Sequence, residues 1–167
     1  LLKEVNENGL TYKENAIKKA RFISKKIQLP TLGDDSGLEI KALGNKPGVK
    51  SKRYAGKNAT DHERIKKVLT QLKNIPSQHR QARFVCHTAL CLPDGSIYNT
   101  KGHIDGKIAF YPKGKNGFGY DPIFIVKGFR GKTMAELPAR IKNKISHRAF
   151  AINRMKILLK KLLWSAK

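Results

Sequence analysis

The chain has 167 residues, of which 40% are hydrophobic, a composition that is ordinary for a globular domain with its own core and that excludes a disordered chain. No apolar run is long enough to cross a membrane, and we expect no signal peptide at Leu1. The formal net charge is +23, from 35 Lys and Arg against 12 Asp and Glu, so the chain favours polyanionic partners such as nucleotides, nucleic acid or acidic membrane surfaces.

The cations are distributed along the whole chain rather than gathered into one tract. We interpret them as a solvated coat that also favours a triphosphate ligand. A nucleic-acid-binding protein is the alternative, although the sequence has neither an RNP-like aromatic motif nor a clear helix-turn-helix. Cys86 and Cys91 lie at an odd offset in one strand-like run, which places them on opposite strand faces and argues against a disulfide between them. This cysteine use fits the reducing cytoplasm.

The first predicted helix spans Thr11 to Lys26. Thr11 opens a capping-box pattern, apolar residues then recur at helical spacing, and Pro30 ends the helix. Two extended segments, Leu29 to Leu32 and Leu38 to Ala42, flank a Gly-Asp-Asp-Ser-Gly stretch. The glycines of this stretch predict a sharp link between the two segments.

Asp34 and Asp35 are adjacent within that stretch. Each carboxylate raises the cost of ionising the other, and neighbouring side chains in an extended chain point to opposite sides. We therefore expect different roles for the two, one facing a cleft and one supporting the link. A solvated turn is the alternative, and these residues alone favour it.

The middle of the chain begins with an irregular stretch, Leu43 to Gly56. A second helix then opens at a capping box, Thr60 with Glu63, and ends before Pro76. Next comes Ala82 to Leu92, whose apolar and β-branched residues predict a strand buried on both faces.

The rest of the chain predicts hairpin strands and further helices. Pro93 to Ser96 forms a turn, Ile97 to Thr100 is its hairpin partner, and Gly102 to Phe110 is another strand, interrupted at Gly106. The later elements are a short strand from Ile123 to Val126, a brief helix from Thr133 that Pro138 interrupts, and a last helix capped by Ser146. This order predicts an α/β fold, a single domain with a mixed twisted sheet and flanking helices.

Three stretches in the chain, in a fixed order, carry chemically active side chains: the acidic stretch, the glycine-aromatic segment Gly117–Phe124, and the cationic segment Lys142–Arg148, which we expect to open a helix. Together they resemble the inosine/xanthosine triphosphate pyrophosphatase family, house-cleaning enzymes that hydrolyse aberrant purine nucleoside triphosphates. The resemblance extends from about Gly9 to the last helix. Shorter matches are Glu14-Asn15-Ala16, Ala42-Leu43-Gly44, Pro47-Gly48, Arg53-Tyr54-Ala55-Gly56, Ala82-Arg83-Phe84 and Ala135-Glu136-Leu137.

The resemblance implies one pyrophosphatase domain over residues 1–167, with two lobes around an active-site cleft, that assembles as a homodimer. It implies hydrolysis of ITP, dITP and XTP to the monophosphate and pyrophosphate with Mg²⁺. A related nucleotide pyrophosphatase of different base preference, such as the septum-formation inhibitor type, is an alternative. The glycine-aromatic and Ser-His-Arg motifs argue against it.

The resemblance also assigns catalytic and metal-binding roles. Asp35 matches the general base of the family, which also lies at the metal, and Glu7 matches a second acidic ligand. Two carboxylates with phosphate oxygens would satisfy Mg²⁺. A solvated surface acid is the alternative role for Glu7, and Glu14, already explained as a helix cap, is the other candidate ligand.

For the phosphates, Lys19 matches a phosphate-binding lysine, and Lys142 is expected near the phosphate or the sugar. Lys52 or Arg53 could also reach the phosphates, and Arg53 could instead form a salt bridge or a dimer contact. Ser36 could donate a hydrogen bond to the nucleotide or stabilise its own loop.

The resemblance assigns recognition of the base to Phe118, Gly119, Tyr120, Asp121, His147 and Arg148. An Arg donor favours the oxygen at C6 of hypoxanthine or xanthine over the amino group of adenine. Phe118 can stack on the purine, and Tyr120 is expected mainly to pack within the loop. A helix N-terminal position without a ligand is the alternative for His147.

The family normally begins with a strand and a Thr/Ser-x-Asn-x-x-Lys loop that grips the triphosphate, and nothing in Leu1 to Leu10 matches it. We therefore expect the chain to be N-terminally incomplete.

Overall fold

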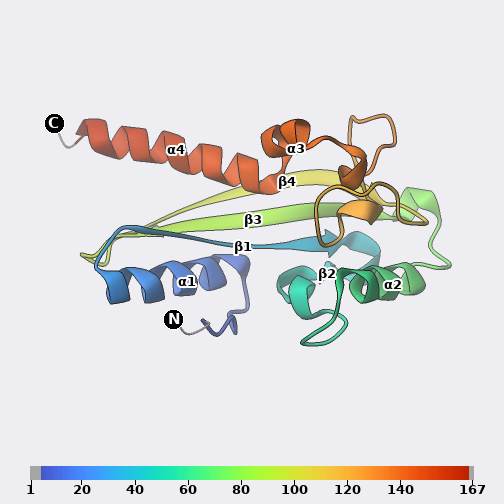
Figure 1. Cartoon of the computed structure of the whole chain (residues 1–167), viewed down its shortest axis with the longest axis horizontal. Coiled ribbons are helices and arrows are strands. Elements are labelled where there is room, and N and C mark those ends of the chain that lie inside the picture. The colour runs from blue at the N-terminus through green and yellow to red at the C-terminus, as the bar shows by residue number, and fades with distance from the viewer. Residues whose placement is uncertain (1–4, 166–167) are drawn as a thin grey trace. The chain divides into compact units, whose positions relative to one another are not determined.

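The structure, a computed structural model, describes residues 5–165 and confirms the expected α/β fold (Figure 1). Its helices are α1 (Tyr12–Ile27), α2 (Asp61–Gln71), α3 (Ala139–Ile145) and α4 (His147–Ser165). Its strands are β1 (Thr31–Ile40), β2 (Lys46–Pro47), β3 (Gln81–Cys91), β4 (Ile97–Ile108) and β5 (Phe124–Val126). They form one sheet in the order β2-β1-β3-β4-β5. The stretch Leu1 to Leu10, which lacks the expected phosphate loop, includes residues 1–4, which lie outside the described residues.

The sequence predicts a mixed sheet, and the strand pairings with a described register are antiparallel. In the β1–β2 pair Glu39 lies opposite Pro47, and in the β4–β5 pair Lys107 lies opposite Ile125. Strands β3 and β4 are joined by the predicted tight turn, in which the Gly95 N–H donates to a carbonyl oxygen at 3.0 Å. Short hairpin connections of this kind can join only antiparallel strands.

The prediction of a sharp link at Gly33–Gly37 is wrong, because the acidic stretch lies within the single strand β1. Neither glycine adopts a positive φ. A Cβ added at Gly33 would lie 2.9 Å from the Ala16 carbonyl oxygen and from the Ala20 nitrogen. This glycine therefore permits close packing of α1 on the strand and does not turn the chain.

The prediction of two separate strands after the turn is also wrong. One strand, β4, continues through Gly102 and Gly106 and ends at Ile108. A Cβ at Gly102 would collide with the His147 carbonyl oxygen and the Ala151 nitrogen. The absence of a side chain here lets α4 lie directly on β4.

The segment Lys142–Arg148 does not open one helix, as predicted, but is divided between two. Lys142 belongs to α3, and Ser146 has extended backbone angles, φ −66° and ψ 154°, before α4 begins at His147. Ser146 thus occupies the expected N-cap position. The predicted helix at Thr133 has its capping box but amounts to one 3₁₀ turn, Met134–Glu136, because Pro138 follows.

The predicted caps of the first two long helices are confirmed. The Thr11 hydroxyl accepts the Glu14 N–H at 3.1 Å, and Thr60 and Glu63 form a complete capping box at the start of α2.

The chain divides into two compact units, which we describe separately. Unit 1 comprises Leu1–Ser36, Cys86–Gly102 and His147–Lys167. Unit 2 comprises Gly37–Val85 and His103–Ser146. The two-lobed cleft predicted from the family resemblance would depend on how unit 1 and unit 2 are placed relative to each other, so it stays a prediction.

In unit 1, α1 and α4 lie on opposite sides of the strands (Figure 1). Small residues line the contact between α1 and β3, where Ala16 and Ala20 pack against Ala89 and Cys91. Small side chains let a helix approach a strand closely, so the polar residues on the same helix are brought near β1. Cys86 and Cys91 are buried and free, as predicted.

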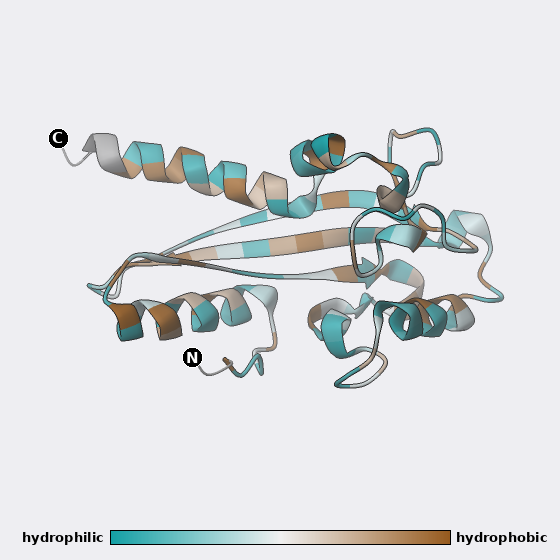
Figure 2. Ribbon diagram, viewed as in Figure 1, coloured by the Kyte–Doolittle hydropathy of each residue, from teal (hydrophilic) through white to brown (hydrophobic). Residues whose placement is uncertain are grey.

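Unit 2 contains a larger apolar core, which packs α2 against the strands and the segment that follows β4. Its fully buried members include Leu38, Ile40, Val68, Leu72, Ile108, Ile123, Phe124, Val126 and Met134. Figure 2 shows hydrophobic residues along much of β3 and mostly hydrophilic residues on the visible side of α2. Among the described helices, none is long and apolar enough to cross a membrane.

Candidate active site

The two carboxylates of β1 have different partners. Asp35 is buried, at 7% exposure, and its partners lie on α1. Asp34 is half-buried and is held by Arg148 from the start of α4. Successive strand residues point to opposite faces, so adjacent aspartates contact different helices.

Asn15 and Lys19 hold Asp35 from one face of α1. The Asn15 side-chain amide donates to Asp35 Oδ2 at 3.2 Å, and Lys19 Nζ donates to Asp35 Oδ1 at 3.0 Å. The two residues are four positions apart, so their side chains lie one above the other on the helix. Both carboxylate oxygens of Asp35 are therefore fixed in direction.

Burial raises the pKa of Asp35 above the ordinary value of 3.8. Hydrogen bonds from Lys19 and Asn15, together with the Lys19 charge, lower this pKa, while the negative charge of Glu7 raises it. The effect of burial is larger, and the resulting carboxylate is more basic than an exposed aspartate.

Glu7 approaches the same lysine. Its Oε1 atom lies 3.5 Å from Lys19 Nζ, so one ammonium group lies within ion-pair distance of both Glu7 and Asp35. Glu14, the alternative ligand, instead accepts the Leu10 N–H at 2.8 Å as part of the helix cap. In the described part of the chain no three His, Cys, Asp or Glu side chains gather into a metal-binding group.

Arg148 joins α4 to β1 through Asp34. Its Nε and Nη2 atoms donate to Asp34 Oδ2 at 3.0 and 2.8 Å, and Nη2 also donates to Ser36 Oγ at 3.3 Å. His147 precedes it and is buried, at 6% exposure. Cys86 lies beside this group, with its sulfur 3.7 Å from Asp34 Oδ2. Burial, followed by the Asp34 charge, raises the pKa of Cys86 to about 12, so this thiol stays neutral.

These residues form a connected group in unit 1, which we call the acidic cluster. Its members are Glu7, Asn15, Lys19, Asp34, Asp35, Ser36 and Arg148.

Unit 2 contains the predicted base-recognition segment Gly117–Asp121, which we call the aromatic loop. Asp121 is buried, at 3% exposure. Its Oδ2 atom accepts the Phe118 N–H at 2.9 Å and forms an ion pair with Lys142. The Lys142 ammonium also lies 4.4 Å from the centre of the Phe118 ring. The Phe118 side chain is 61% exposed, which leaves ring surface open for stacking.

Gly117 and Tyr120 shape the same loop. Gly117 has φ +82°, and an added Cβ would collide with Asp121 Oδ2, so only glycine fits. Tyr120 is buried, and its hydroxyl donates to the Ser51 carbonyl oxygen at 2.9 Å. Burial raises the pKa of Tyr120. These contacts favour the packing role expected for this residue.

Three predicted residues are not members of these two groups. Lys142 pairs with Asp121 from α3, and His147 precedes Arg148 at the start of α4. Arg53 is exposed at the end of the 3₁₀ segment Gly48–Arg53 of unit 2. Sequence reasoning did not assign a role to Asn15, although its position one turn before Lys19 was a usable signal.

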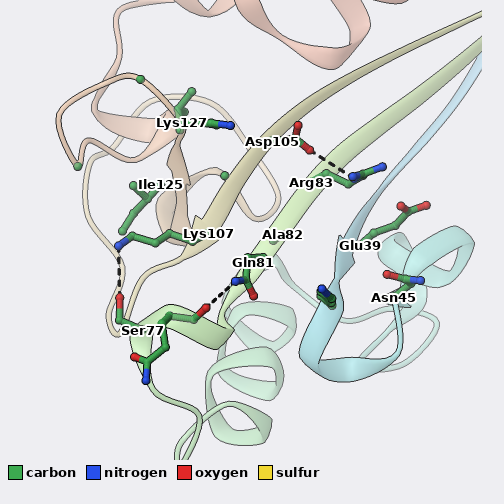
Figure 3. Close-up of a pocket in the computed structure, with 16 residues that line it drawn as sticks. Glu39, Asn45, Ser77, Gln81, Ala82, Arg83, Asp105, Lys107, Ile125 and Lys127 are labelled. Carbon is green, nitrogen blue, oxygen red and sulfur yellow. Dashed lines mark hydrogen bonds and ion pairs between the residues drawn. The ribbon is translucent and has the colours of Figure 1, made fainter.

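An open pocket of about 1220 Å³ lies on the exposed side of the sheet in unit 2 (Figure 3). Two pairs of its polar side chains contact each other: Arg83 with Asp105 at 3.4 Å, and Lys107 with Ser77 at 3.3 Å. None of the predicted site residues lines it.

Known proteins resemble this chain in sequence and in structure. Residues 1–158 match the Ham1 family. The dITP/XTP pyrophosphatase of Bacillus subtilis (strain 168) is 49% identical over 156 residues, which are 93% of this chain and 78% of that protein. The solved Ham1 protein of Staphylococcus aureus has a TM-score of 0.89 at 43% identity, and the HAM1 protein of Coxiella burnetii has 0.89 at 48%. Each alignment covers 95% of this chain and 81% of the other. The resemblance inferred from the sequence is thereby confirmed, and this chain belongs to the Ham1 family.

Proposed function

We propose that this chain is a nucleoside triphosphate pyrophosphatase that hydrolyses dITP, ITP and XTP and so removes them from the nucleotide pool. The observation that carries the proposal is the buried carboxylate of Asp35, held by Lys19 and Asn15 in a member of the Ham1 family. The name of the Bacillus subtilis relative, dITP/XTP pyrophosphatase, supports the reaction and the substrate class.

In the proposed reaction Asp35 is the general base. It accepts a proton from water as the oxygen of that water bonds to the α-phosphorus. The bond from the α-phosphorus to its bridging oxygen breaks, and pyrophosphate leaves with that oxygen, so the products are the monophosphate and pyrophosphate. The raised pKa of Asp35 makes it a stronger proton acceptor than an ordinary aspartate.

We propose Mg²⁺ as the cofactor, held by Asp35 and Glu7. The two carboxylates are suited to hold a cation, because both already lie within ion-pair distance of one cation, the Lys19 ammonium. Mg²⁺ prefers oxygen ligands and commonly uses one or two carboxylates with substrate phosphates. When bound, the ion supplies neutralisation of phosphate charge and acidification of the attacking water.

The remaining site residues bind and orient the nucleotide. The cations Lys19, Arg53 and Lys142 attract the phosphates, and Ser36 donates a hydrogen bond. In the aromatic loop, Phe118 stacks on the purine while Gly119, Tyr120 and Asp121 hold the backbone that presents it. At the start of α4, His147 and Arg148 recognise the C6 oxygen that distinguishes inosine and xanthosine from adenosine.

We also propose that residues 1–167 act as one catalytic domain, that the protein is a homodimer and that it works in the cytoplasm. The family resemblance supports the domain and the dimer. The two free, buried cysteines support a reducing compartment.

A substrate panel tests the proposal. Pyrophosphate release with Mg²⁺ should be faster from dITP, ITP and XTP than from dATP and dGTP. Asp35→Asn should slow it by roughly 10²-fold or more, because the general base is lost. Glu39→Gln makes the same chemical change elsewhere on β1 and is the matched control. Equal rates on all five nucleotides, or an active Asp35→Asn variant, would refute the assignment.

A further inference from the structure

The backbone of the aromatic loop is anchored to α2 by a carboxylate. The Gly119 N–H donates to Asp61 Oδ2 at 2.6 Å, and Asp61 is the first residue of α2. Gly119 has φ +63°, and no atom lies within 4 Å of an added Cβ. Neighbouring atoms therefore do not hold the Gly119 backbone in place, whereas its hydrogen bond to Asp61 does.

The anchoring carboxylate is itself held by an arginine one helical turn later. Arg64 Nη2 donates to Asp61 Oδ1, while Arg64 Nη1 donates to the Lys52 carbonyl oxygen at 2.8 Å and to the Ala59 carbonyl oxygen. Hydrogen bonds between charged groups are stronger than neutral ones. Asp61 is thus oriented by a guanidinium that is fixed at several points.

Two carboxylates therefore fix two consecutive N–H groups. Asp121 accepts the N–H of Phe118, and Asp61 accepts the N–H of Gly119. Holding both peptide groups restricts the backbone angles of Phe118, which set the direction of its ring. An exposed ring that is already oriented loses less entropy when a base stacks on it.

The Asp61 carboxylate is charged at neutral pH. Burial by itself would raise its pKa, but the hydrogen bonds from Arg64 and the Gly119 N–H, with the Arg64 charge, leave the pKa below 3.8. The anchor therefore operates over the whole neutral range.

We propose that Asp61, supported by Arg64, is a positioning residue for purine recognition, which holds the aromatic loop so that Phe118 is ready to stack on the base. This inference rests on the proposed function and extends it to residues outside the predicted site.

Glu63 offers a matched control, because it is a second carboxylate in the first turn of α2. It accepts the Thr60 N–H at 2.7 Å as a helix cap, and its described contacts are local to that turn. Asp61→Ala should raise KM for dITP about tenfold or more, with a much smaller change in kcat, as expected for loss of a charged hydrogen bond. Glu63→Ala should leave KM unchanged while lowering thermal stability. Asp61→Asn should recover much of the wild-type KM, since its amide oxygen can still accept the Gly119 N–H.

Hydrogen exchange of the Gly119 amide gives a second measurement that does not depend on activity. It should be faster in Asp61→Ala and unchanged in Glu63→Ala. Equal KM effects of the two alanine variants, or faster exchange without a change in KM, would overturn the positioning role. A wild-type protein that hydrolyses none of the purine substrates would instead refute the proposed function, and the exchange measurement would still test the anchor itself.

Discussion

Asp35 is an aspartate that the folded protein makes harder to ionise. Its raised pKa follows from burial, which the donors Lys19 and Asn15 offset only in part. A carboxyl whose pKa is higher in the folded state stabilises the fold below its unfolded pKa, and this contribution is lost as pH rises through the folded pKa. At neutral pH the charged Asp35 therefore lowers the free energy of unfolding.

We accordingly expect Asp35→Asn to be inactive but more stable than the wild type at pH 7. This gain in the free energy of unfolding should shrink as pH falls toward 3.8, the ordinary pKa of aspartate. Urea titrations of both proteins across this range would measure it. Lower stability of Asp35→Asn at pH 7 would mean that the ion pair with Lys19 outweighs burial.

Arg148 should determine base preference. Arg148→Ala should lower kcat/KM for ITP far more than for ATP, by about 1–3 kcal/mol of discrimination, because a donor to the C6 oxygen is lost. Arg148 also donates to Asp34, so Asp34→Asn provides the comparison, since it weakens this anchor but keeps the arginine. Equal losses for ITP and ATP in Arg148→Ala would make the residue structural or phosphate-binding.

At the scale of elements, the position of α4 depends on a single missing side chain. Gly102 on β4 faces the backbone of α4 at His147 and Ala151, with no space for a Cβ. This contact sets where α4 begins, and hence where His147 and Arg148 lie within unit 1.

Gly102→Ala should therefore displace α4 and destabilise the protein by about 1–3 kcal/mol, the range for overpacking a well-packed site. Its activity on dITP should fall as well, because the start of α4 moves. Asn99→Ala, at an exposed position of the same strand, is the control and should have little effect. If the Gly102→Ala variant unfolds in urea at the same concentration as the wild type, α4 shifts without strain and this prediction is wrong.

At the scale of the whole molecule, the net charge of +23 should act on the rate of substrate capture. A strongly positive field attracts a triphosphate over long distances, and salt screens that attraction. We expect kcat/KM for dITP to fall several-fold between about 50 and 500 mM KCl at constant free Mg²⁺, while kcat changes little.

A salt-independent kcat/KM would show that the charge is only a solvated coat. The same salt series with a random oligonucleotide tests the nucleic-acid alternative. Useful affinity at physiological salt with a steep salt slope would favour that alternative.

Local patterns in the sequence predicted the long helices α1, α2 and α4, their caps and the family. The capping residues Thr11 and Thr60 act within one turn of chain, and the ordered motifs lie on short contiguous segments, so no long-range contact was needed to recognise them. Gly33 was misread as part of a sharp link, because a glycine that lets a helix approach a strand has the same local sequence as one that turns the chain.

Only the tertiary structure could show which partners the functional groups have. The Asp35 carboxylate is held by Asn15 and Lys19, which are 20 and 16 positions away in the chain. The Gly119 N–H meets Asp61 across 58 positions. Charge, burial and hydrogen bonding at such groups depend on how distant elements pack. The residue types were therefore evident in the sequence, whereas the pKa of Asp35 and the anchoring of the aromatic loop were decided by the fold.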